Sequence, residues 1–290
     1  MNYSPLNLTA FFTRQGQLFL AVVVFLAAWQ NSWAAEGKLL ATPGVFQVEG
    51  AGGGGLVPWA QLGGYATEDE IAATAFCSRA QLDEFDLTVC GAGVNFYDRT
   101  EITVAQQRFG VFPLKLDIQQ NIYGLKTRLF GDLVYGDLPQ ISLGMQHKTL
   151  QDGKIAYLLG AQKDSGTDIY VAASRLHLGA LAGFNAFWNI TLRASDANQM
   201  GLLGFGAEHN HRSINAEAAV AIFLNRHLAL GTEYRQKPNN LTLREDDWQD
   251  IFIAWFPNKS CSLTLAWIDL GTIAAVPDQR GWYLSLGGYW

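Results

Sequence analysis

The sequence predicts an all-β protein, an antiparallel transmembrane β-barrel of about 12–14 strands with 14 as the best count. The chain of 290 residues is 49% hydrophobic but only 16% charged, whereas about 25% of the residues in soluble domains are charged. After the N-terminal region, the chain has no apolar run long enough for a helical membrane span. Short stretches that alternate between apolar and polar residues recur along the sequence. Because backbone polar groups must be paired within lipid, a closed barrel fits these observations better than the alternative, a secreted soluble β-protein.

The first 34 residues are expected to be a cleaved signal peptide. Arg14 is the only charged side chain there, and the apolar run 18–29 follows it. The sequence Ser32-Trp33-Ala34 then gives a small-x-small pattern that suits cleavage. A transmembrane anchor is the alternative, but a run of this length spans only about 18 Å of a core of about 30 Å. We therefore expect export to the bacterial outer membrane.

Residues 35–58 are expected to precede the barrel, which would occupy residues 59–290. The stretch "EGAGGGGLVPWA" (49–60) contains five glycines, which disfavour stable strand pairing. It is interpreted as a flexible lead-in, with a plug inserted into the barrel as the alternative.

Fourteen segments are candidate strands, and an even number is typical of bacterial barrels. The alternation is clearest near the C-terminus, where Leu263, Leu265 and Trp267 oppose Ser262 and Thr264. With this count, the long segment 149–166 would lie at the periplasmic end, where short turns are usual. Either it contains a short helix or one strand is miscounted. The candidate strands are 59–66, 70–79, 85–97, 101–107, 123–130, 139–148, 167–176, 184–193, 201–210, 213–224, 227–237, 248–256, 261–270 and 281–290.

Several charged residues fall on the polar faces of these strands and are expected to line the lumen, because charge facing lipid is costly. Two interpretations remain open: a polar, water-filled pore, or a closed network of salt bridges without a passage. Both signs of charge occur, so no preference for anions or cations follows. The candidate lumen-lining residues are Glu101, Lys126, Arg128, Glu217, Glu233 and Arg235.

No catalytic, cofactor or metal site is expected. The chain lacks the GxSxG, HExxH and P-loop patterns. The cluster "EHNH" contains His209 and His211, which are expected at the polar rim of a strand. Cys77 and Cys90 flank a predicted turn and could form a disulfide, a question that the sequence leaves open; Cys261 would remain unpaired.

The C-terminal segment "GWYLSLGGYW" is expected to be the strand that closes the barrel. Its alternation and length of about 30 Å suit a tilted membrane strand. The terminal aromatic resembles the signal that the barrel-assembly machinery recognises during insertion. The residues assigned to closure and insertion are Trp282, Leu284, Leu286, Tyr289 and Trp290.

Several blocks resemble the DUF3034 proteins, a proteobacterial family of unknown function assigned to the outer-membrane β-barrel group. They include "GKLLATPGVFQVEGAGGGGLVPWAQLGGYAT", "GLKTRLFGD", "DSGTDIYVAAS" and "REDDWQDIFIAWFPNKSCSLTLAWIDLG". The resemblance implies an outer-membrane barrel and brings no catalytic residue, ligand or transported substrate.

The first functional hypothesis is a pore or uptake channel for small polar or amphipathic solutes. The second is a plugged structural barrel that anchors partners. A lipid-modifying enzyme that uses the "EHNH" cluster is a third, and we do not expect an enzyme. Expected partners are outer-membrane lipids and the barrel-assembly machinery; the net charge of −6 disfavours nucleic acid.

Overall fold

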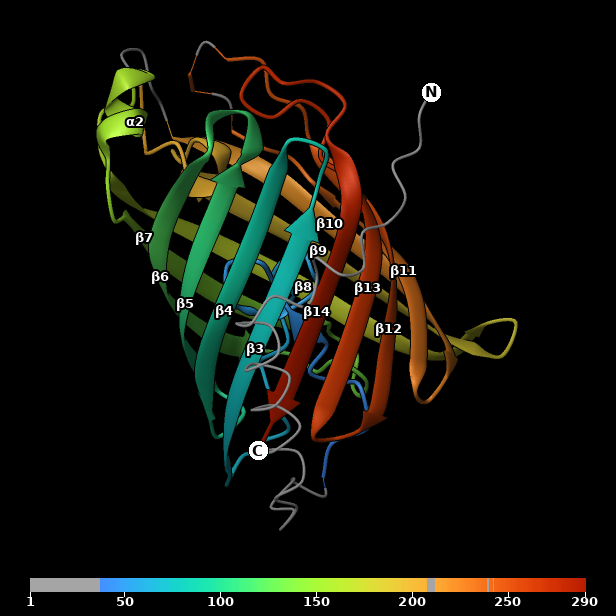
Figure 1. Ribbon diagram of the computed structural model, residues 1–290. Helices are drawn as coiled ribbons and strands as arrows, with labels where there is room; N and C mark the ends of the chain where they lie inside the picture. Colours follow the sequence, from blue (N-terminus) through green and yellow to red (C-terminus); the bar gives the residue numbers. More distant parts are fainter. Residues whose placement is uncertain (1–36, 208–211, 239, 242) are drawn as a thin grey trace. The chain divides into compact units, whose positions relative to one another are not determined.

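A computed structural model describes residues 37–207, 212–238, 240–241 and 243–290. The expected signal peptide and the cluster at 208–211 lie outside these residues. Within them, twelve antiparallel strands form a closed barrel (Figure 1). The strands are β3 (Ile71–Gln81), β4 (Phe85–Phe96), β5 (Thr100–Val111), β6 (Leu116–Phe130), β7 (Gln140–Leu150), β8 (Ser165–Leu181), β9 (Phe184–Ser195), β10 (Ser213–Asn225), β11 (Leu228–Arg235), β12 (Trp248–Asn258), β13 (Cys261–Asp269) and β14 (Arg280–Tyr289).

The barrel closes where β14 pairs with β3. Tyr289 lies opposite Thr74 in this register. Beyond it, the backbone N–H and C=O of Trp290 bond to the C=O and N–H of Ala73, both with N···O distances of 2.9 Å. A closed sheet leaves no unpaired edge. The segment 281–290 therefore occupies the closing position that its sequence suggests.

The best count of 14 strands is wrong, because two candidate segments are not barrel strands. Residues 59–66 lie inside the barrel, before β3 begins. Residues 201–207 form loop structure next to a short 3-10 helix, Gln199–Gly201. Gly201, Gly204 and Gly206 all have positive φ angles there, which interrupts an extended strand. The twelve observed strands fall within the predicted range.

The two ends of the barrel differ in their connections. At the end where β14 finishes, called here the C-terminal end, β10–β11 and β12–β13 are joined by two-residue turns. The opposite end, called the loop end, carries the longer connections 151–164, 196–212, 236–247 and 270–279. The long segment after β7 lies at the loop end because 201–210 is not a strand, and it contains the short helix α2 (Lys154–Leu158). A second 3-10 helix, Phe112–Leu114, joins β5 to β6.

The two faces of each strand differ in character. On β12, for example, Ile251 is 63% exposed, whereas Asp250 and Phe252 on either side are buried. No helix in the described part of the chain is long and apolar enough to cross a membrane. Apolar side chains are exposed on the outward faces of β5 to β14: Ile102, Tyr123, Leu143, Val171, Leu192, Val220, Leu230, Ile253, Leu265 and Trp282.

The segment before β3 fills the barrel interior. Residues 43–66, called here the lumenal segment, are all buried. It contains the small hairpin of β1 (Val45–Phe46) and β2 (Gly52–Gly53), and Figure 1 shows it in blue behind the strands. Gly50 has a φ of 99°, which favours glycine, and a β-carbon there would lie 3.0 Å from Cβ of Ala105 on β5. The glycine run therefore permits close contact with the wall, and the segment lies in the lumen, as in the alternative of a plug, rather than outside it as a lead-in.

Candidate functional site: a charged and occupied lumen

Glu49 is the only charged residue of the lumenal segment, and three wall cations surround it. Lys148 on β7 contacts Oε1 of Glu49. Oε2 lies 3.3 Å from Nη1 of Arg193 on β9 and 2.8 Å from Nη2 of Arg235 on β11. Gln47 donates from Nε2 to the same oxygen at 2.6 Å. Both carboxylate oxygens are thus held by donors from separate strands.

Two wall carboxylates complete this network. Arg193 donates from Nε to Glu217 on β10 at 2.5 Å. Asp168 on β8 accepts from Nζ of Lys148 at 2.7 Å. Arg235 also approaches Glu217, with an Nε–Oε1 distance of 3.6 Å. Three cations and three carboxylates, counting Glu49, are therefore buried together.

The electrostatic surroundings stabilise Glu49 as an anion. Burial alone would raise its pKa. The opposing charges of Arg235, Lys148 and Arg193 outweigh this effect and hold the pKa of Glu49 well below its usual range.

Glu101 and Lys126 bind the backbone of the lumenal segment. Glu101 accepts hydrogen bonds from the N–H groups of Gly52, at 3.1 Å, and Gly63. Lys126 donates to the carbonyl oxygens of Gly52 and Trp59 at 2.7 and 3.3 Å. The two charged side chains are also 3.5 Å apart, between Nζ and Oε1. This ion pair therefore holds the backbone of the lumenal segment at Gly52, Trp59 and Gly63.

Glu233 forms a third attachment. It accepts from the N–H of Leu56 at 2.7 Å and from Nε1 of Trp59 at 3.1 Å. On the neighbouring strand, Asp250 accepts from the backbone N–H of Glu233 at 2.9 Å. The wall thus binds the segment through side chains from several strands, and these three attachments are polar.

Arg128 has a different position from the other five candidate residues. It lies at the C-terminal end, pairs with Asp98 and donates from Nη2 to the carbonyl oxygen of Gly131 at 2.7 Å. It borders a surface hollow of about 260 Å³ that Lys38 and Gln61 also line. Glu101, Lys126, Glu217, Glu233 and Arg235 are instead buried within the barrel.

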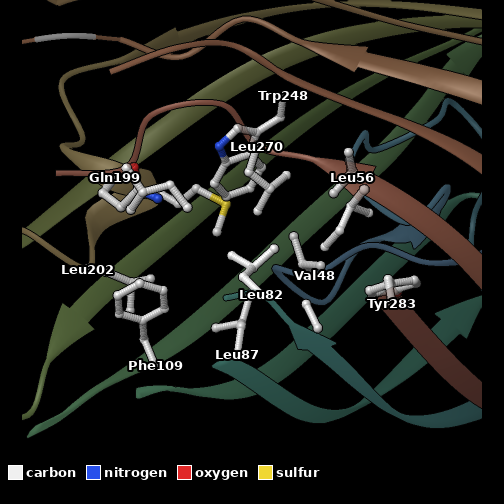
Figure 2. Close-up of a pocket in the computed structure, with 14 residues that line it drawn as sticks. Val48, Leu56, Leu82, Leu87, Phe109, Gln199, Leu202, Trp248, Leu270 and Tyr283 are labelled. Atoms are coloured by element: carbon white, nitrogen blue, oxygen red, sulfur yellow. The ribbon is translucent and has the colours of Figure 1, made fainter. Parts of the chain in front are cut away.

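The part of the lumen nearer the loop end contains a small apolar cavity (Figure 2). Val48 and Leu56 of the lumenal segment line it together with Leu202 and Trp248. The space open to water-sized molecules is about 20 Å³, which is room for about one water molecule. Near the loop end, the carbonyl oxygen of Met200 accepts a hydrogen bond from Nε2 of Gln120 at 3.3 Å. Packing and polar contacts together close the interior.

The remaining candidate residues lie on the outer wall and at its seam. Cys77 and Cys90 are direct partners on β3 and β4 and form a disulfide on the outward face; Cys261 is free. Along β14, Trp282 is exposed, Leu284 and Leu286 are half-buried, Tyr289 is buried and Trp290 is exposed. Tyr289 donates from its hydroxyl to the carbonyl oxygen of Gly44 at 3.0 Å, which joins the closing strand to the lumenal region.

Sequence reasoning missed five central residues. Lys148, Asp168, Arg193 and Asp250 occupy inward positions in candidate strands, so the same alternation could have found them. Glu49 gave no such signal, because its segment had no strand pattern. Among the described residues, no cluster of three or more His, Cys, Asp or Glu could hold a metal ion.

The fold and site define a closed antiparallel β-barrel with a charged lumen occupied by its own N-terminal region. The chain belongs to the DUF3034 family, described as proteins of unknown function, whose model matches residues 42–287. No curated protein matches the chain.

Solved structures share a distant similarity. The KdgM porin in complex with disordered oligogalacturonate has 5% identity and a TM-score of 0.49, covering 74% of this chain and 98% of its own. The outer membrane protein Omp33 of Acinetobacter baumannii has 6% identity and a TM-score of 0.46, covering 77% and 100%. The outer membrane phospholipase A of Escherichia coli has 6% identity and a TM-score of 0.35, covering 76% and 92%. At these values, the similarities do not indicate what this chain binds.

Proposed function

We propose that the protein is an outer-membrane barrel for the uptake of small solutes, which the lumenal segment closes and from which it withdraws. The apolar outward faces support a membrane location, because a lipid-exposed barrel needs such a band. The observation that carries the proposal is the polar attachment of the segment to a charged wall through Glu49, Glu101 and Glu233.

A charged wall suits a lumen that becomes filled with water. Buried ion pairs often stabilise a fold no more than apolar side chains of similar volume. A permanently filled barrel could therefore use an apolar interior. Eight strands make a barrel that side chains can fill, whereas 16–18 strands leave an aqueous channel. Twelve strands fall between these sizes, so withdrawal of the segment would expose a polar passage.

Recordings in planar lipid bilayers test this function. The mature protein should show rare openings, and deletion of residues 37–66 should give sustained discrete conductance. Migration of the unheated deletion variant as a compact barrel on a denaturing gel is the control for folding. A folded deletion variant that never conducts would exclude the channel.

The occupation of the lumen by residues 43–66 favours one alternative, a structural barrel that anchors partners. Residues 43–66 are buried throughout, and the apolar cavity between them and the loop end is small. Purification from membranes with a stable partner, together with a deletion variant that does not conduct, would support this alternative.

A further inference from the structure

The three cations around Glu49 form a site whose chemistry does not depend on the lumenal segment itself. Lys148, Arg193 and Arg235 belong to the barrel wall, on β7, β9 and β11, and each is at most 4% exposed. They approach a single carboxylate from separate directions, one on Oε1 and two on Oε2. Charge-assisted hydrogen bonds to both oxygens are the usual way in which proteins recognise a carboxylate.

The charge balance of the wall changes when the segment leaves. With Glu49 in place, three cations face three carboxylates. Without it, two wall carboxylates, Asp168 and Glu217, still form ion pairs with these three cations, so this ion-paired cluster carries one positive charge in excess. Arg235 also loses the carbonyl oxygen of Leu56, to which it donates at 3.2 Å. A vacated site would therefore attract a small anion.

We propose that Lys148, Arg193 and Arg235 form a binding site for the carboxylate group of a small solute, and that Glu49 occupies this site as an internal substitute. The proposal deepens the proposed function and rests on it, because a transported solute reaches the site only when the lumenal segment withdraws. Entry of a carboxylate solute and displacement of Glu49 are then the same exchange of one carboxylate for another. The solute would stabilise the withdrawn state by its affinity for that state.

Chemical rescue of a truncated side chain tests the site in the full chain. Glu49→Ala removes the carboxylate and leaves room for acetate among the same three cations. Sodium acetate should raise the unfolding midpoint of this variant saturably, by about 3–6 °C at tenfold excess over its dissociation constant. Sodium chloride at equal ionic strength should not. Glu68→Ala, which removes an exposed carboxylate from the link to β3, is the matched control and should not respond to acetate.

Hydrogen exchange in the wild-type protein gives a second measurement that needs no variant to fold. Acetate that competes with Glu49 favours withdrawal, so backbone amides of residues 45–57 should exchange about tenfold faster at tenfold excess over the dissociation constant than in chloride. If exchange is equal in the two salts, the proposal is overturned, as it is if a folded Glu49→Ala variant gains nothing from acetate.

These measurements do not require current through the barrel. Acetate binding without any conductance would retain the carboxylate site and exclude the channel. Conductance of the deletion variant without an acetate effect would retain the channel and exclude the carboxylate site.

Discussion

At the scale of residues, Glu49 connects the lumenal segment to the wall. It shares contacts with Lys148, Arg193 and Arg235, all of them buried. Removing one partner of a buried ion pair is costly because the remaining charge loses its compensation. The ion pairs between the lumenal segment and the wall therefore depend on Glu49, because the segment contains no other charged side chain.

Glu49→Gln should destabilise the folded barrel by about 3–5 kcal/mol, because three buried cations lose one of their carboxylates. Urea unfolding in a fixed detergent or lipid measures this change. Glu68→Gln removes an equal charge from an exposed position and should alter stability by about 0.5 kcal/mol or less. Equal stability of the two variants would contradict the role assigned to Glu49.

The stabilisation by Glu49 should depend on pH in a defined direction. Its pKa is held below the usual range in the folded protein, against about 4.3 in an unfolded chain. A lowered folded-state pKa gives stability that is complete above the unfolded value and is lost as the pH falls below it. The stability difference between the wild type and Glu49→Gln should therefore stay constant from pH 7 to about pH 5 and decrease below about pH 4. A stability difference that grows on acidification would contradict a lowered pKa of Glu49 in the folded protein.

Alternation places residues on strands well, but it does not reveal which charges meet. The inward positions of Glu101, Lys126 and Glu217 follow from a period of two. Their partners depend on the register between strands and on a segment that is far away in sequence. Glu49 lies beside Lys148, 99 positions further along the chain, and no local pattern encodes that contact.

At the scale of elements, the outward faces carry the membrane assignment. Val220 lies near the middle of β10 and is 52% exposed, whereas Leu224 lies close to the end of the same strand and is 43% exposed. Val220→Lys should destabilise the barrel in lipid by about 2–4 kcal/mol, and Leu224→Lys by about 1 kcal/mol or less. Urea unfolding in lipid vesicles compares them. Equal costs at both positions would contradict a membrane-embedded band.

The closing strand should control assembly. Trp290 pairs with Ala73 through its backbone, and Tyr289 contacts the carbonyl oxygen of Gly44. Deleting both residues removes the end of the seam, so the truncated protein should accumulate in the periplasm. Cell fractionation measures this, with Leu284→Val as a control that preserves the seam. Normal levels of the truncated protein in the outer membrane would contradict the assignment.

Two elements show the limit of strand prediction. Residues 59–66 have a strand-like composition, but they lie in the lumen and bond to the barrel wall. Ala60, for example, donates from its N–H to Oγ of Ser174 on β8. In 201–207, glycines adopt positive φ angles and Phe205 is buried inside the barrel. A period of two describes apolar spacing, and it does not distinguish a membrane strand from a chain packed within the lumen.

At the scale of the whole molecule, the barrel and its lumenal segment form one interior. The wall supplies the charges and the segment supplies their partners, so a closed lumen and a polar lumen are compatible. The proposed function requires that the segment closes the barrel and opens it by leaving.

A reversible cross-link between segment and wall tests this claim most directly. A β-carbon on Gly63 would be in van der Waals contact, at 3.6 Å, with Cγ2 of Thr74 on β3, so we choose these two positions for the cysteine pair. Single-channel currents of the Gly63→Cys/Thr74→Cys protein would be recorded first under oxidising conditions and then after reduction. The wild type, which has the Cys77–Cys90 disulfide and the free Cys261 but no cysteine at 63 or 74, controls for the reductant. Oxidation should abolish the openings and reduction should restore them; openings that persist unchanged in the cross-linked protein would contradict closure by the segment.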